Sequence, residues 1–456
     1  MSIKLTNKNE IINLINQHDG EYVIINNPEY IFPEREFYRL ADRNLNPLKM
    51  LDAVLMDMDG TTTTTEELCI HSLEYMVRVI SGLESHLIWP GLDRTEDYPH
   101  IIGNSTTKHV EYLIQKYHKG IKSDNLSKAY IFAALWTLIY SQDLNRVNEV
   151  KVNLKKFLPV KDSAVFASII PDKSNASKKG FAELLKSAAK KFYGKLHIHG
   201  KDDIVRASID IYYQRYHEIL HRIKKGESEK LQKELGLATG KSLIEPMQGT
   251  PVFLALVKGL LGNEADKLTD ELISDYIRKD KSFLPPSSTA GIWQKLRRLG
   301  LYFEKHPVKV AVVTSSIMYE AEIVLSQLFE EIRNVIAEWK INAARKKRIL
   351  ERFSSPHNFY DAIITATDSS EIRLKPHRDL YSIALYKLGV PKSSFRNVIG
   401  FEDSESGTIA IRAAGVGKSI AVPFAHTQGH NLAAATLIAE GGLPEIIIKN
   451  NIFIKL

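Results

Sequence analysis

The stretch Leu51–Thr65, which reads LDAVLMDMDGTTTTT, constrains the fold more than any other part of the chain. A short apolar run ends in two aspartates, Asp57 and Asp59, and then in a glycine and a row of threonines. Such a run indicates a buried strand followed by a turn. Alternation along the strand directs both carboxylates to one side, which at the carboxyl end of a parallel strand is the usual ligand position.

Two carboxylates this close repel each other unless a cation or a proton lies between them. On these residues alone, an Asx-rich turn that caps the next helix is the simpler interpretation. The remainder of the chain decides between the two interpretations.

Composition limits the class of protein. A chain of 456 residues predicts two or three domains, and 44% hydrophobic with 25% charged residues is typical of soluble globular proteins. The net charge of +7 suits anionic partners, but 61 basic against 54 acidic residues is not the profile of a dedicated nucleic-acid binder. The single cysteine, Cys69, excludes an internal disulfide and a cysteine-based zinc site.

The location of the protein follows from two further observations. The first residues contain no signal-peptide apolar core, and the longest apolar stretch, Tyr130–Tyr140, is too short to cross a bilayer. We therefore expect a cytoplasmic protein with no membrane partner.

Periodicity divides the chain into three parts. Residues 1–50 form an extension that we expect to pack on the following domain, with a strand at Tyr22–Ile25. From about residue 66 to about residue 285 the apolar spacing is helical, which predicts a helical insert. The predicted helices of the insert include His109–Tyr117, Lys128–Tyr140, Phe181–Phe192, Asp203–Ile223, Pro251–Leu261 and Leu268–Arg278.

Strand character returns after the insert. Strands are predicted at Val308–Val313, Ala362–Ile364, Asn397–Phe401 and Ser419–Val422. Helices are predicted between them at Ile317–Phe329, Ile332–Phe353, His377–Leu388, Gly407–Ala414 and Leu432–Ile438. Alternating strands and helices imply an α/β fold with a parallel sheet. Three strands end in acid or hydroxyl groups, which should converge at one edge of the sheet.

Four separated motifs follow in a consistent order. They are DMDGT at Asp57–Thr61, VVTSS at Val312–Ser316, LKPHRDLYSIALYKLGV at Leu374–Val390 and GFEDSESGTIAIRAAGV at Gly400–Val416. With these motifs the chain resembles the haloacid dehalogenase-like (HAD) hydrolase superfamily, in the helical-cap branch with phosphoglycolate phosphatases and β-phosphoglucomutases. The resemblance implies a Rossmann-like core at residues 51–65 and 286–456, with a large α-helical cap at 66–285 inserted after the first strand. It also places cap hinges near Thr61–Glu66 and Pro285–Thr289.

The resemblance assigns roles to the acidic residues. Asp57 would attack phosphorus and form an aspartyl phosphate. Asp59 would protonate the leaving oxygen, later deprotonate water, and help to hold Mg²⁺ through its backbone carbonyl. Asp403 would be a further carboxylate on the metal beside Asp57, with Glu402 as a ligand or a supporting base.

The remaining motif residues would handle the phosphoryl group. Thr314 offers a hydroxyl and Ser315 a backbone N–H to the phosphoryl oxygens, and Lys375 would neutralise charge in the transition state. Each of these residues has a simpler interpretation, such as a helix cap or a solvated lysine. Four independent caps would not reproduce this order and these residue types, so the functional interpretation is favoured.

Asp59 separates subclasses, because dehalogenases and phosphonatases lack an aspartate two residues after the nucleophile. The mutase pattern expects a histidine ten residues beyond Asp59 and a Gly-x-Ser-Arg in the cap. Here Cys69 occupies the first position, and Thr106 follows Ser105 in the second. We therefore expect an Mg²⁺-dependent phosphatase acting on a small phosphorylated metabolite. A phosphomutase, or a non-catalytic protein that binds anions or nucleic acid on the same fold, remains an alternative.

Overall fold

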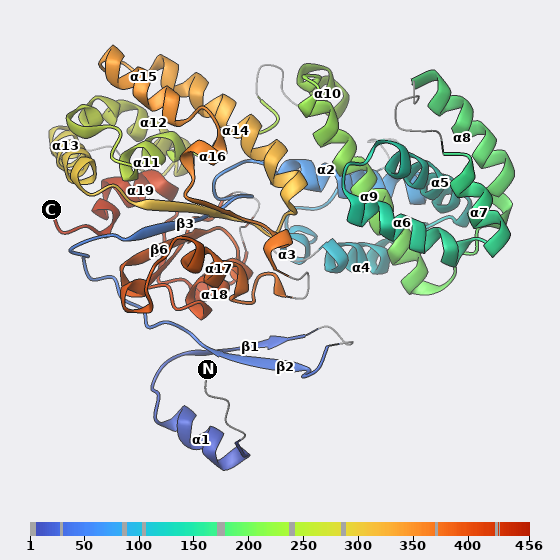
Figure 1. The fold of residues 1–456 in the computed structure, drawn as a ribbon, viewed down its shortest axis with the longest axis horizontal. Coiled ribbons are helices and arrows are strands. Elements are labelled where there is room, and N and C mark those ends of the chain that lie inside the picture. The colour runs from blue at the N-terminus through green and yellow to red at the C-terminus, as the bar shows by residue number, and fades with distance from the viewer. Residues whose placement is uncertain are drawn as a thin grey trace.

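A parallel sheet lies at the centre of the computed structural model, which describes residues 6–27, 31–83, 89–102, 106–170, 178–236, 242–283, 289–369, 373–424, 427 and 429–456 (Figure 1). The strand order is β5-β4-β3-β6-β7-β8, and every neighbouring pair is parallel. The strands are β3 (Ala53–Asp57), β4 (Lys309–Val313), β5 (Ala362–Ile364), β6 (Val398–Glu402), β7 (Lys418–Ala421) and β8 (Leu437–Ile438). The predicted α/β class is confirmed.

Helices cover both faces of this sheet, so β3 is buried along its whole length and reads as a continuous apolar run. Ala53 and Leu55 pack in the cluster that includes α17 (Asp379–Lys387) and α18 (Glu405–Ala413). Val54 and Met56 face the opposite cluster, with α13 (Ala290–Lys305) and α19 (Gly442–Ile448). Figure 1 shows these two pairs of helices on opposite faces of the sheet.

The helical insert begins directly after β3. Its helices are α2 (Glu66–Ser81), α3 (Tyr98–Ile101), α4 (Thr106–Tyr117), α5 (Ser123–Tyr140), α6 (Leu144–Phe157), α7 (Val160–Ser168), α8 (Lys178–Phe192), α9 (Gly200–Lys224) and α10 (Ser228–Leu235). Helix α9 packs against α2, α4 and α5 and forms the centre of the insert. The insert lies beside the core, at the opposite end from α13 (Figure 1). Among the described residues, no helix is long and apolar enough to cross a membrane.

The chain returns to the core before residue 250. The amide of Thr64 donates to the carbonyl of Glu245 at 3.1 Å, and Met247 N donates to the carbonyl of Thr62 at 3.0 Å. Helices α11 (Thr250–Val257) and α12 (Thr269–Lys279) then contact α13 and α19 of the core. We therefore propose that the insert ends near residue 245 rather than at 285. The hinge predicted at Pro285–Thr289 lies, except for Thr289, outside the described residues.

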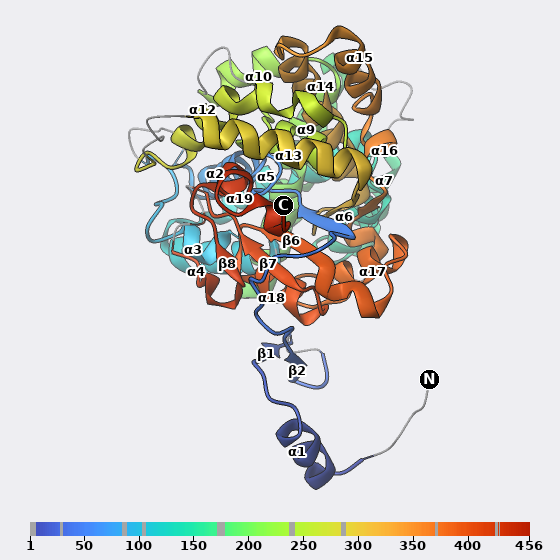
Figure 2. The ribbon, with the colours of Figure 1, turned by 90° about the vertical axis from the view of Figure 1, so that its left-hand side faces the viewer.

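The N-terminal segment consists of α1 (Lys8–Asn16) and an antiparallel hairpin of β1 (Tyr22–Asn26) and β2 (Arg35–Arg39). The hairpin contacts the core through two arginines. Buried Arg412 donates to Glu21 at 2.6 Å and to the carbonyl of Ala41 at 2.9 Å, and Arg373 donates to Glu36 at 2.7 Å. Helix α1 has no buried residue, and Figure 2 shows it away from the sheet.

Two predicted elements differ from the structure. Helix α14 (Met318–Glu338) runs through the break expected at residue 330, because Phe329 and Ile332 are both buried and continue one apolar stripe. It is followed by α15 (Ala343–Arg352) and α16 (Pro356–Phe359). The helix predicted at Leu432–Ile438 is wrong. A short 3₁₀ turn forms there instead, and β8 then pairs with β7 as the edge strand.

The buried Arg412 provides a test of how the N-terminal hairpin is held. Arg412→Leu leaves carbonyl groups at Ala41 and Ala434 without their donor, and should lower the free energy of unfolding by about 3 kcal/mol in urea titrations. Arg39→Leu is the matched control. The contacts of Arg39 with the Asp19 carbonyl at 3.0 Å and with Asp42 at 3.5 Å are both solvent-exposed, so its loss should change stability little. Equal losses in both variants would contradict the anchoring role.

Candidate active site

The predicted site residues meet at the carboxyl edge of the sheet. Asp57 ends β3 and is the register partner of Val313, after which Thr314 begins the loop that leaves β4. Glu402 ends β6 on the other side of β3, and Asp403 follows it. Because parallel strands all end at the same edge, three distant segments place their polar groups together.

Lys375 lies between two carboxylates. Its ammonium contacts Asp57 Oδ1 and lies 2.6 Å from Glu402 Oε1, and all three side chains are buried. Burial lowers the pKa of Lys375, but the charges of Asp57 and Glu402 outweigh burial and raise it overall. Burial and the charge of Glu402 raise the pKa of Asp57, and Lys375 acts in the opposite direction. A buried lysine is tolerated here because its charge is paired on two sides.

Glu402 is held by a set of donors. The hydroxyl of Tyr381 in α17 donates to Oε1 at 2.7 Å, and Ser404 Oγ donates to Oε2 at 3.1 Å. A Cβ at Gly407 would lie 1.8 Å from the Glu402 carboxyl carbon, so only glycine leaves room for this side chain. Tyr381 was not singled out from the sequence; its position six residues after Lys375, on the following helix, was the available signal.

Asp59 occupies a separate, hydroxyl-lined position. Thr65 donates to its Oδ1, and the hydroxyls of Thr314 and Ser316 donate to its Oδ2 at 3.1 and 3.2 Å. Burial raises the pKa of Asp59, while the hydroxyls of Thr65 and Thr314 lower it. Ser316 and Thr65 are contacts that sequence reasoning missed. Ser315 is exposed between the two hydroxyl donors, and the role of its backbone N–H remains a prediction.

An acidic cluster with the character of a metal site adjoins Lys375. Asp57, Glu402 and Asp403 each offer an oxygen, and these atoms lie within 4.8 Å of one another. Within the described part of the chain, buried Asp403 Oδ2 has no hydrogen-bond partner. Gly60, at φ +82°, lies against this atom, and a Cβ there would be 2.4 Å from it. Hard divalent cations prefer such oxygens, so the cluster fits Mg²⁺.

The four predicted metal ligands are not equivalent in the structure. The Asp59 carboxylate is outside the cluster of three, and its predicted contribution through the backbone carbonyl stays a prediction. Burial and the charge of Asp57 raise the pKa of Asp403. A cation beside Asp403 would offset that repulsion.

Two further ionisable groups influence the site. Burial and the charge of Asp59 raise the pKa of Glu66, in the first turn of α2, to about 8. Burial lowers the pKa of Lys279, in the last turn of α12, to about 8, and the charge of Asp403 acts against this. The sequence indicated Glu66 only through its place after the first motif, and gave no signal for Lys279.

Among known proteins, the matches to this chain are solved structures of low sequence identity. No protein-family model and no curated protein matches this chain. CbbY from Rhodobacter sphaeroides, in complex with phosphate, is 15% identical, with 87% of this chain and 96% of that chain covered at a TM-score of 0.36. A HAD family hydrolase from Deinococcus radiodurans R1, with bound phosphate and sodium, is 13% identical, with 90% and 99% covered and a TM-score of 0.38.

A putative β-phosphoglucomutase from Bacteroides vulgatus is similar at 14% identity, with 90% of this chain and 92% of that chain covered and a TM-score of 0.36. Structural similarities with TM-scores this low give no information about the chemistry of this chain. What the structure itself shows is a six-stranded parallel α/β core whose strand order brings residues of the four motifs together at one edge of the sheet.

The raised pKa of Glu66 predicts a pH-dependent stability. Its pKa in the folded chain, about 8, exceeds the ordinary value of 4.5, so the charged carboxylate destabilises the fold increasingly as pH rises between these values. In EDTA, Glu66→Gln should be more stable than wild type by about 2 kcal/mol at pH 8 and nearly equal to it at pH 4.5. Denaturant titration at both pH values measures this. The neighbouring exposed Glu67→Gln is the control, and a pH-independent difference for Glu66→Gln would refute the assignment.

Proposed function

We propose that this protein is an Mg²⁺-dependent phosphatase that hydrolyses a small phosphate monoester through an aspartyl phosphate on Asp57. The observation that carries the proposal is the buried Asp57–Lys375–Glu402 contact beside the unpartnered oxygen of Asp403. This arrangement provides a carboxylate nucleophile, a fixed positive charge and an acidic cation site within one small volume.

The charges of the site favour a divalent cation. A phosphate monoester is dianionic, and Lys375 alone does not offset three neighbouring carboxylates. When bound, Mg²⁺ would shield the phosphoryl oxygens from the charge of the nucleophile. Asp57 and Asp403 would hold it, because Glu402 already accepts hydrogen bonds from Lys375, Tyr381 and Ser404.

Residues of this chain would carry out the remaining steps, which are nucleophilic attack, proton transfer and charge stabilisation. A carboxylate oxygen of Asp57 attacks phosphorus, and the bond from phosphorus to the leaving alcohol oxygen breaks as Asp59 gives that oxygen its proton. Asp59 then removes a proton from water, which attacks the aspartyl phosphate and releases inorganic phosphate and Asp57. Burial of Asp59 favours its protonated form, which the first step requires. Lys375 offsets the charge on the phosphoryl group throughout.

The environment of Cys69 supports a phosphatase rather than a phosphomutase. Cys69 occupies the position where the mutase pattern expects a histidine. Burial raises the pKa of its thiol well above the ordinary value, so it stays protonated near neutral pH. A thiol held in this state does not exchange protons as an imidazole does.

Substitution of the nucleophile tests the proposal directly. Asp57→Asn should lower kcat for phosphate release from an aryl phosphate, measured with and without Mg²⁺, by about 10⁴-fold, because an amide does not attack phosphorus. Asp52→Asn is the control and should keep its activity, because Asp52 lies just before the other end of β3 and accepts a hydrogen bond from Asn397 at 3.0 Å. Mg²⁺-dependent turnover by Asp57→Asn at the wild-type rate would refute the mechanism.

Cation binding has a readout that does not require turnover. Saturating Mg²⁺ should raise the Tm of the wild-type protein by about 3 °C at pH 8. The increase should be smaller at pH 5, because burial and repulsion raise the pKa values of Asp57 and Asp403 and protons then compete with the cation. Asp403→Asn should lose most of the increase, whereas Asp52→Asn should retain it. An equal increase in Asp403→Asn would place the cation elsewhere.

A further inference from the structure

A buried histidine–glutamate contact joins the insert to the core. His217 lies on α9, the longest helix of the insert, and its Nε2 is 2.8 Å from Oε1 of Glu320 in the first turn of α14. The side chains are only 2% and 6% exposed. A buried polar contact of this kind is costly to break, because each partner would remain without a hydrogen bond.

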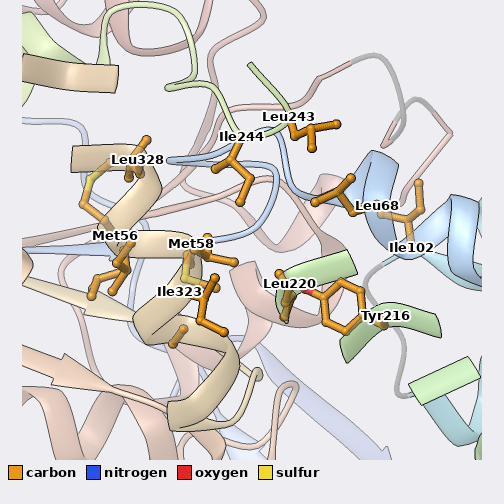
Figure 3. Close-up of a cluster of buried hydrophobic side chains, with 14 of the residues drawn as sticks. Met56, Met58, Leu68, Ile102, Tyr216, Leu220, Leu243, Ile244, Ile323 and Leu328 are labelled. Atoms are coloured by element: carbon orange, nitrogen blue, oxygen red, sulfur yellow. The ribbon is translucent and has the colours of Figure 1, made fainter. Parts of the chain in front are cut away.

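Apolar and aromatic contacts surround this pair. The ring of Tyr319 lies edge-on to His217 at 5.4 Å between ring centroids. One turn further along each helix, Leu220 and Ile323 belong to a buried cluster that spans the insert and the core (Figure 3). The surface between α9 and α14 is therefore closed to water at this point.

Helix α14 begins at the loop that holds Asp59. Thr314 and Ser316 donate to the Asp59 carboxylate, and Ser316 N donates to Thr314 Oγ1 at 3.0 Å. Glu320 follows Ser316 by four residues, within the first turn of α14. A shift of this turn moves the loop, because so short a segment has little freedom to absorb it.

We propose that His217 is a positioning residue, which fixes the Thr314–Ser316 loop through Glu320 and so couples docking of the insert to the placement of Asp59. His217 acts through Glu320 and contacts no reacting atom. The proposal rests on the proposed function for its effect on catalysis, whereas its effect on the loop does not require that function.

The first test is substitution of the histidine in the full-length protein. His217→Phe keeps a ring and removes the donor to Glu320, so kcat for an aryl phosphate should fall about tenfold with little change in KM. His217→Gln, which can still donate, should restore most of kcat. His221→Phe is the matched control. His221 lies one turn away on α9, and its ring is edge-on to that of Trp136, with 6.4 Å between the ring centroids. It should retain wild-type kcat.

The second test is hydrogen exchange without substrate. Amides of residues 314–320 should exchange about tenfold faster in His217→Phe than in wild type and His221→Phe, with the central strands unchanged. Should His217→Phe not fold, Glu320→Met tests the same contact from the core side by the same measurement. Wild-type exchange at 314–320 in a folded variant would overturn the proposal.

The two readouts separate the two proposals. If the wild-type protein shows no turnover but loop exchange is faster in His217→Phe than in wild type, the coupling stands and the phosphatase function is rejected. Loss of turnover in Asp57→Asn, together with unchanged exchange and kcat in His217→Phe, would keep the function and reject the coupling.

Discussion

The buried ammonium of Lys375 between Asp57 and Glu402 is the interaction on which the site depends. A lysine can be buried only where carboxylates surround it, and these carboxylates come from two adjacent strands. When ionised, the carboxylates of Asp57, Glu402 and Asp403 together carry three negative charges. Lys375 and a monovalent counterion would offset only two of these charges. The site therefore carries an excess of negative charge, which a divalent cation would balance. Under the proposed function, substrate phosphate would approach only after that charge is balanced.

Adjacent acids in the sequence have different environments in the fold. Glu402 is the last residue of β6, and its two oxygens accept from Lys375, Tyr381 and Ser404. Asp403 follows the strand and keeps Oδ2 without a partner among the described residues. Glu402 thus orients the lysine, and Asp403 is available for a cation. The motif assigned Asp403 to the metal but left Glu402 open between a metal ligand and a supporting base.

Local patterns predicted the core and the motif residues, because both depend on short segments. The apolar runs before Asp57 and Thr314 predicted the strands, and their alternation with helices predicted a parallel sheet but not the order of its strands. What failed depended on tertiary contacts. The segment Leu432–Ile438 has helical spacing, but its end is recruited as an edge strand by β7. Tyr381 was missed because its role depends on proximity to Glu402 in space. The end that we propose for the insert, near residue 245, has no pair of helix-breaking residues comparable with Pro285-Pro286 in the sequence.

The insert is attached to the core at more than its two chain crossings. At the crossings, the amide of Thr64 donates to the carbonyl of Glu245. The buried contact of His217 with Glu320 joins the insert to the core at a further point. Separation of α9 from α14 must therefore break a buried polar contact. Under the proposed function, an insert docked in this one position would place its residues to distinguish substrates that the core treats alike.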